Sequence, residues 1–273
     1  MLLATDLDGT FLGGTQETRQ QLYQLIAVHP DIDLIFVTGR GLESVMPLLS
    51  DPMIPQPSYI ICDVGCTVVD GETLQPVVEV QGRIDDVWPG EYAIQAAVEH
   101  IPGLVRQDVP QERRCSYFSA PDVIEEYLDE LTRIGNSLNC DVLYSAGLYL
   151  DFLPRNINKG STLTALVEHL KIPIEDVMVA GDTLNDLSMY EHDFIGVCVG
   201  ESEEGLLEAT EGRARVYHAG AAGAGGILEA ISHFGFLGAE GIDAEGRDDI
   251  EPGPSDLVIV YHRLPYEEYL EDG

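Results

Sequence analysis

Short apolar runs alternate with amphipathic stretches near the start of the chain. Three runs, at residues 2–7, 33–38 and 58–62, are largely apolar. Between them, residues 16–28 and 41–50 place apolar side chains at helical spacing. A short continuous apolar run is typical of a strand with both faces buried, as in a parallel sheet. The alternation predicts an α/β fold, a doubly wound, Rossmann-like parallel sheet, with functional groups at the carboxyl ends of its strands.

The pattern changes between about residues 78 and 155. Strand-like runs there surround two helical stretches, at residues 90–100 and 121–138. The expected strands lie at residues 103–107, 115–119, 140–144 and 148–153. Alternation then returns, with helices at 161–170, at 186–190 and from about 226, and strands at 176–180 and 194–199. We therefore expect a Rossmann-like core of residues 1–80 and 155–235, with an inserted α+β cap at residues 81–154.

The last part of the chain differs in composition. Residues 236–255 are rich in Gly, Asp, Glu and Pro, which is typical of a linker. The apolar run at 256–261 then indicates one more buried strand, and the sequence stops at Gly273. We expect residues 256–273 to be the start of a further domain of a longer polypeptide.

Composition narrows the partners. The sequence holds 14 Lys and Arg against 48 Asp and Glu, a net charge of −34. Such a surface repels nucleic acid and anionic membranes, so neither is expected as a partner. No stretch reaches the roughly 18 apolar residues of a membrane-spanning helix, and no signal peptide is evident, so a cytoplasmic location is expected. The five scattered cysteines suit neither a disulfide framework nor a zinc site.

Two carboxylates follow the first expected strand. Asp6 and Asp8 stand two residues apart, directly before Gly9 and Thr10. If the turn directs them differently, one can act as a nucleophile beside a cation and the other as a general acid and base for the leaving group. A solvated turn is the alternative for this pair on its own.

Two further segments could hold an anion. Thr38, Gly39 and Arg40 follow the second strand, where a hydroxyl and free backbone N–H groups can cradle a phosphate, although Thr-Gly is also common in turns. Lys159 stands just before an expected helix, where its charge could neutralise phosphate. A solvated surface lysine is the alternative there.

Clustered oxygen ligands follow the strand at 176–180. Asp182, Asn185 and Asp186 lie within five residues, and such a cluster at a strand end suits Mg²⁺. A helix N-cap could explain Asp186 alone, but it does not explain the other two.

The four segments, in this order, resemble the haloacid dehalogenase superfamily of phosphotransferases over residues 1–235. The position of the insertion is similar to that of a C2-type cap of subclass B. The resemblance implies that Asp6 is the nucleophile and forms an aspartyl-phosphate. It implies that Asp8 protonates the leaving alcohol and then activates water. The phosphate-binding residues it implies are Thr38, Gly39, Lys159 and Asn185.

The same resemblance implies a Mg²⁺ cofactor. Its ligands would be Asp6, the backbone carbonyl of Asp8, and Asp182, with Asp186 and Asn185 in support. The pair Asp6 and Asp8 favours a phosphatase over a dehalogenase, because a dehalogenase needs no second acid.

The substrate is expected to be a small sugar phosphate. Polar groups that could contact its hydroxyls are Arg40, Gln107, Gln111, Arg114, Ser116, Tyr117 and Asp151. Ordinary solvated side chains are the alternative for each. Residues 150–160 look similar to the return from cap to core in sucrose-phosphate phosphatases.

The tail points to one sugar. Residues 257–267 resemble the opening strand and turn of glucosylglycerol-phosphate synthases. This implies a phosphatase half fused to a glycosyltransferase that continues beyond Gly273, with glucosylglycerol phosphate as substrate. The acidic composition fits a salt-stressed organism that makes glucosylglycerol as a compatible solute.

Other functions stay open at this point. The substrate could be sucrose phosphate or another sugar phosphate, and a phosphomutase would pass the phosphate to a sugar hydroxyl instead of water. A catalytically silent regulatory domain of a glycosyltransferase is the alternative of another class. Phosphate release from a chromogenic ester, measured with and without Mg²⁺, distinguishes an active phosphatase from a catalytically silent domain.

Overall fold

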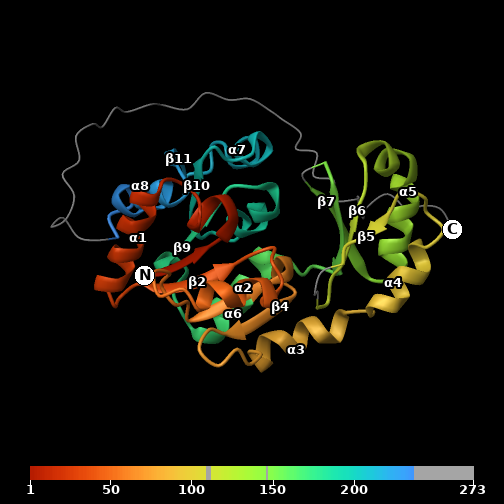
Figure 1. Cartoon of the computed structure of the whole chain (residues 1–273), viewed down its shortest axis with the longest axis horizontal. Coiled ribbons are helices and arrows are strands. Elements are labelled where there is room, and N and C mark those ends of the chain that lie inside the picture. The colour runs from red at the N-terminus through yellow and green to blue at the C-terminus, as the bar shows by residue number, and fades with distance from the viewer. Residues whose placement is uncertain (109–111, 146, 237–273) are drawn as a thin grey trace.

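The chain forms two sheets with helices packed against them (Figure 1). The computed structural model describes residues 1–108, 112–145 and 147–236. The expected linker from residue 237 onward, the strand at 256–261 and the site residue Gln111 lie outside the described residues. None of the described helices has the length and apolar character needed to cross a bilayer.

The larger sheet has seven strands in the order β11-β10-β9-β1-β2-β3-β4. All neighbours pair in parallel except β3 and β4, which are antiparallel. Its strands are β1 (Leu2–Thr5), β2 (Asp33–Val37), β3 (Tyr59–Cys62), β4 (Thr67–Asp70), β9 (Val177–Gly181), β10 (Ile195–Gly200) and β11 (Val216–Ala222). The predicted α/β class with a parallel sheet is confirmed. The edge strands β4 and β11 were not predicted from the sequence.

Helices cover both faces of this sheet, which explains the continuous apolar runs. In β2, Leu34 and Phe36 pack on one side, and Ile35 and Val37 pack on the other. The first layer holds α1 (Gln16–Val28), α2 (Leu42–Leu49) and α8 (Ala224–His233). The second holds α3 (Val78–Val87), α6 (Lys159–Leu170) and α7 (Glu204–Thr210). Alternating side chains of each strand therefore enter two separate apolar clusters.

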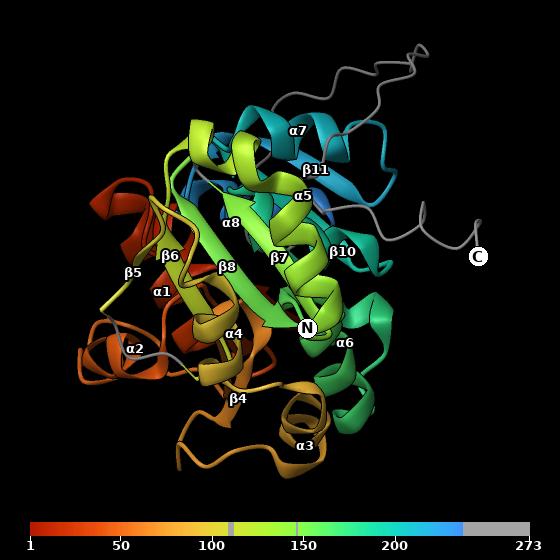
Figure 2. The same ribbon diagram turned by 90° about the vertical axis from the view of Figure 1, so that its right-hand side faces the viewer.

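The smaller sheet is antiparallel, with the order β5-β6-β8-β7. Its strands are β5 (Val105–Arg106), β6 (Cys115–Phe118), β7 (Cys140–Ser145) and β8 (Tyr149–Pro154). Helices α4 (Glu91–Val98) and α5 (Pro121–Ser137) pack on its outer face, in front of the sheet in Figure 2. The inner face is turned toward the core (Figure 1). We call the part from α4 to β8 the cap.

Short turns join the strands to the site. The segments η1 (Leu7–Phe11), η2 (Asp63–Gly65) and η4 (Leu184–Glu191) follow β1, β3 and β9, and η3 (Ile174–Asp176) precedes β9. The helix expected at 186–190 is the 3₁₀ helix η4. The carboxyl ends of β1, β2, β3 and β9 thus lead into one edge of the sheet, where the predicted groups gather.

Candidate active site

Asp6 sits at the centre of this edge. Its backbone N–H donates to the Ala180 carbonyl at 2.9 Å, so β1 and β9 stay paired up to the carboxylate. The residue is only 6% exposed. Gly9, with φ of +79°, then turns the chain, and a Cβ there would lie 2.1 Å from Asp182 Oδ2. Only glycine allows so close an approach between the β1 turn and Asp182.

Lys159 is fully buried and reaches the same point from α6. Its Nζ donates to Asp6 Oδ1 at 2.7 Å and to Asp186 Oδ1 at 2.6 Å. Asn158 caps the helix by accepting from the Ser161 N–H at 2.8 Å, which fixes where α6 begins. The structure therefore rules out a solvated surface position for Lys159.

Two more carboxylates complete the cluster. Asp186 Oδ2 accepts from the N–H groups of Asp182 and Thr183, each at 3.0 Å, and its other oxygen contacts Lys159. The N-cap of η4 is Thr183, and Asp186 is the third helical residue of its capping box. Asp182 Oδ1 accepts from Thr10 Oγ1 at 2.8 Å. One carboxylate oxygen from each of Asp6, Asp182 and Asp186 lies within 4.8 Å of the others.

Burial perturbs these groups. It raises the pKa of Asp6 to about 7, although the Lys159 ammonium opposes the shift. Burial, together with Asp186, raises the pKa of Asp182 to about 6. Burial lowers the pKa of Lys159, but the carboxylates of Asp186 and Asp6 outweigh it and hold that pKa above its ordinary value. Three clustered carboxylates beside one ammonium leave excess negative charge, and oxygen donors of this kind fit a hard divalent cation.

The second strand end lies beside the cluster. Thr38 is buried, and its Oγ1 accepts from the Arg40 N–H at 3.1 Å. A Cβ on Gly39 would meet nothing closer than 3.9 Å, so the backbone there is open to an approaching group. The Arg40 guanidinium contacts both carboxylate oxygens of Asp8, which is more exposed than the three clustered carboxylates. Asp8 does not join them through its side chain.

Arg114, in the cap, places its guanidinium against the core. Arg114 Nη1 donates to the Gly39 carbonyl at 2.8 Å, and Nη2 lies 3.5 Å from Asp63 Oδ1. The two side chains are 10% and 2% exposed. Burial raises the pKa of Asp63 to about 6, and Arg114 opposes that shift. The sequence did not single out Asp63, although its place after β3, level with Asp6 and Thr38, could have indicated it.

The other cap residues divide between two faces. Ser116 and Asp151 lie opposite each other on β6 and β8, and the hydroxyl donates to the carboxylate. Tyr117 points the other way and packs in the apolar cluster beneath α4 and α5. Gln107, just beyond β5, donates its backbone N–H to the Ser116 carbonyl at 2.9 Å. Thus Ser116 and Asp151 share the inner face, and Tyr117 does not.

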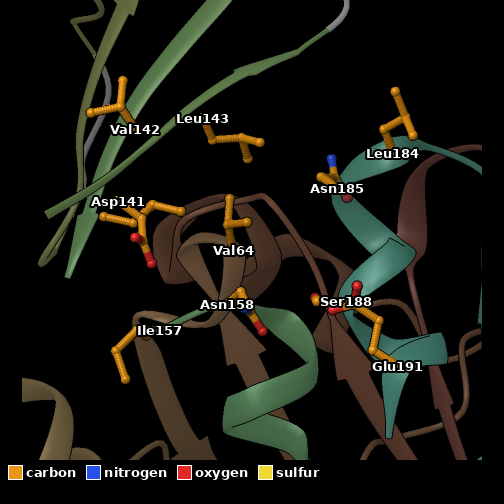
Figure 3. Close-up of a pocket in the computed structure, with 11 residues that line it drawn as sticks. Val64, Asp141, Val142, Leu143, Ile157, Asn158, Leu184, Asn185, Ser188 and Glu191 are labelled. Atoms are coloured by element: carbon orange, nitrogen blue, oxygen red, sulfur yellow. The ribbon is translucent and has the colours of Figure 1, made fainter. Parts of the chain in front are cut away.

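A cavity of about 190 Å³ lies between β7 of the cap and η4 of the core (Figure 3). Aliphatic side chains form much of its wall, and Asn158 and Asn185 come from the residues just before Lys159 and Asp186. Asn185 Oδ1 is buried and has no hydrogen-bond partner among the described residues. The lining residues are Val64, Asp141, Val142, Leu143, Leu153, Ile157, Asn158, Leu184, Asn185, Ser188 and Glu191. Neither the clustered carboxylates nor Lys159 lines this cavity, and Asn158 and Asn185 link it to them only as chain neighbours of Lys159 and Asp186.

Known proteins resemble the chain over most of its length. Residues 1–235 match the family model described as sucrose-6F-phosphate phosphohydrolase. A glucosylglycerol-phosphate synthase of Pseudomonas anguilliseptica is 58% identical over 98% of this chain, which spans 35% of that protein. A mannosylfructose-phosphate phosphatase of Agrobacterium fabrum is 30% identical, over 86% of this chain and 96% of that protein.

Solved structures agree with the sequence matches. The sucrose-phosphatase from Synechocystis sp. PCC6803, in complex with sucrose and phosphate, superimposes with a TM-score of 0.77. It is 29% identical and covers 87% of this chain and 98% of its own. A haloacid dehalogenase-like hydrolase from Bacteroides thetaiotaomicron, 18% identical over 85% of this chain and 98% of its own, gives 0.62 and shows the shared fold. The predicted fold is confirmed as that of haloacid dehalogenase-like hydrolases, and the chain belongs to the sucrose-6F-phosphate phosphohydrolase family of sugar-phosphate phosphatases.

Proposed function

We propose that this chain is a Mg²⁺-dependent phosphatase that hydrolyses glucosylglycerol phosphate. The observation that carries the choice of sugar is the 58% identity, over 98% of the chain, to a protein named glucosylglycerol-phosphate synthase. The matched family model is that of a phosphatase. A phosphatase that makes up 35% of a synthase's length would remove the phosphate that the rest of the protein leaves on its product.

In the first half-reaction, the Asp6 carboxylate attacks phosphorus and the bond from phosphorus to the alcohol oxygen breaks. Asp8 gives its proton to that oxygen, so the alcohol leaves neutral. Thr38 Oγ1, the Gly39 N–H and Lys159 Nζ hold the phosphoryl oxygens as charge builds on them. The product of this step is an aspartyl-phosphate on Asp6.

In the second half-reaction, Asp8 acts as a base. It takes a proton from water, the water oxygen attacks phosphorus, and the bond to Asp6 breaks. Inorganic phosphate leaves and the Asp6 carboxylate returns. Asp186 serves throughout by holding Lys159 at 2.6 Å, so that the ammonium stays beside Asp6.

The cation would be held by Asp6, Asp182 and Asp186, whose oxygens already gather within 4.8 Å. When bound, Mg²⁺ neutralises charge on the phosphoryl group and on the nucleophile, and so favours their approach. The raised pKa values of Asp6 and Asp182 support this assignment, because burial disfavours their negative charge more than Lys159 compensates it.

The cavity between β7 and η4 would take part of the alcohol. Its aliphatic wall suits the C–H faces of a sugar, and Asn185 Oδ1 offers an unused acceptor for a hydroxyl.

The test is phosphate release from four substrates at equal concentration: glucosylglycerol phosphate, sucrose phosphate, mannosylfructose phosphate and trehalose phosphate. The proposal expects the highest kcat/KM for the first, a requirement for Mg²⁺, and no turnover by Asp6→Asn. A preference for sucrose phosphate would show that the substrate is sucrose phosphate, as in the family's name, and not glucosylglycerol phosphate. Equal rates for all four would refute a glucosylglycerol-specific site.

A further inference from the structure

The Arg40 guanidinium donates two parallel hydrogen bonds to the Asp8 carboxylate. Its Nε donates to Asp8 Oδ2 at 2.7 Å, and its Nη2 donates to Oδ1 at 2.5 Å. A two-pronged contact of this kind fixes the plane of the carboxylate as well as its distance, which a single contact cannot do. The orientation of Asp8 is therefore set by where Arg40 stands.

The backbone of Arg40 is itself fixed between two strand ends. Its N–H donates to Thr38 Oγ1 at 3.1 Å, and its carbonyl accepts from the Asp63 N–H at 2.9 Å. The guanidinium thus extends from a peptide unit held by the turns that follow β2 and β3. Asp8, in contrast, belongs to a turn with Gly9 at φ of +79°, and its side chain is 61% exposed. An exposed carboxylate in such a turn has several rotamers within reach unless a partner selects one.

The pair contributes little to stability. The Arg40 side chain is 32% exposed and that of Asp8 is 61% exposed, and ion pairs in such positions are worth little. The free energy of folding therefore gives little reason for an arginine at this position. Its geometric effect on a reacting group remains, because aligned acid–base catalysis depends on position within fractions of an ångström.

We propose that Arg40 is the positioning residue for Asp8, and that it orients the carboxyl group toward the leaving oxygen. The proposal rests on the proposed phosphatase function, in which Asp8 protonates that oxygen. The two-pronged contact orients the ionised carboxylate; when one carboxyl oxygen carries the proton, the other still accepts from Arg40, so one of the two contacts persists through the step. The proton moves from Asp8 to the alcohol oxygen as the bond to phosphorus breaks.

This role predicts a dependence on the leaving group. A sugar alkoxide is a poor leaving group and needs Asp8's proton, whereas p-nitrophenolate leaves without one. Loss of Arg40 should therefore slow the first half-reaction of sugar phosphates far more than that of p-nitrophenyl phosphate. A residue that binds the phosphoryl group would slow both substrates alike, since they share it.

The test compares Arg40→Gln and Arg40→Lys with Asp8→Asn, using glucosylglycerol phosphate or the best sugar phosphate of the panel, and p-nitrophenyl phosphate. The exposed Arg83 on α3 supplies the matched control, Arg83→Gln. Arg40→Gln should lower kcat on the sugar phosphate by about 10-fold or more, part of the roughly 10²–10⁴-fold that acid–base catalysis supplies. On p-nitrophenyl phosphate the pre-steady-state rate of p-nitrophenol release, which reports the first half-reaction alone, should change by less than about 3-fold. Arg40→Lys should fall between Arg40→Gln and the wild type, because lysine cannot make the two-pronged contact.

Adding Arg40→Gln to Asp8→Asn should cause no further loss on the sugar phosphate, because the positioned group is already gone. Equal losses in the first half-reaction of both substrates, a rise in KM with unchanged kcat on the sugar phosphate, or no effect on either substrate would overturn the proposal. Hydrolysis of p-nitrophenyl phosphate by the wild type, and its absence in Asp6→Asn, test the phosphatase function separately from Arg40.

Discussion

The most quantitative prediction concerns Arg114, which joins the cap to the core. In Arg114→Met, Asp63 in the core loses the cation that stands 3.5 Å from it, and Asp151 in the cap loses the same cation. Both carboxylates are buried. At 3.5 Å and an effective dielectric of about 20, the attraction to Asp63 is about 5 kcal/mol. Removing one partner of a buried pair costs about 3–5 kcal/mol, and we expect a loss of this size in the free energy of unfolding.

Urea unfolding of the full chain, followed by circular dichroism, measures this loss. In a separate thermal unfolding experiment, the melting temperature should fall by roughly 6–20 °C, at about 2–4 °C per kcal/mol for a chain of this size. Arg113→Met is the matched control, because Arg113 is the neighbouring arginine and pairs with Asp85 of α3 and with Glu112, whose side chains are 47% and 68% exposed. It should cost less than about 1 kcal/mol. Equal losses in the two variants would refute the reasoning.

The pH dependence sharpens this test. Burial raises the pKa of Asp63 to about 6 even with Arg114 in place, and without the guanidinium that pKa rises further. An acid whose pKa is raised on folding costs stability as pH rises through the window between its unfolded and folded pKa values. At pH 5 Asp63 is protonated in folded Arg114→Met, so the loss should be smaller than at pH 7.5. Adding Asp63→Asn to Arg114→Met should recover part of the lost free energy of unfolding. A loss that does not change with pH would contradict this explanation.

Two more predictions test the charged cluster. Gly9→Ala should lower kcat by at least about 10²-fold, because its Cβ would meet Asp182 Oδ2 at 2.1 Å. The control is Gly212→Ala, at a similar φ of +72° with nothing within 4 Å of the added Cβ, and it should leave kcat unchanged. Equal effects of the two substitutions would refute the explanation. Mg²⁺ affinity, measured by isothermal titration calorimetry, should weaken roughly 20-fold from pH 8 to pH 6, because Asp6 (pKa about 7) and Asp182 (pKa about 6) must lose their protons to bind the cation. A constant affinity over that range would argue against these ligands.

The sequence was most informative where burial dictates composition. The strands β1, β2, β3 and β9 are covered on both faces, so each leaves a continuous apolar run whose end can be located. Asp6, Thr38 and Asp182 directly follow three of these ends, and parallel strands bring their ends to one edge. That much of the site could be predicted without coordinates.

The cap was less predictable for a physical reason. Side chains alternate between the faces of a strand, and in β6 Cys115, Ser116 and Tyr117 are all buried, so polarity could not show which residues face the core. Tyr117, which we expected to contact the substrate, lies on the face of the sheet that packs against α4 and α5. The contact of Arg114 with Asp63 depends on how the cap sits on the core, and no local pattern encodes it.

The claim on which the account depends is that Asp6 becomes phosphorylated. The Asp8→Asn variant should still accept phosphate from p-nitrophenyl phosphate, since that leaving group needs no acid, but should release it slowly. Acid quenching, reduction of the acyl phosphate with borohydride and peptide mass spectrometry should then reveal homoserine at position 6. An unmodified Asp6 peptide while p-nitrophenol accumulates, or homoserine at another position, would contradict the central claim.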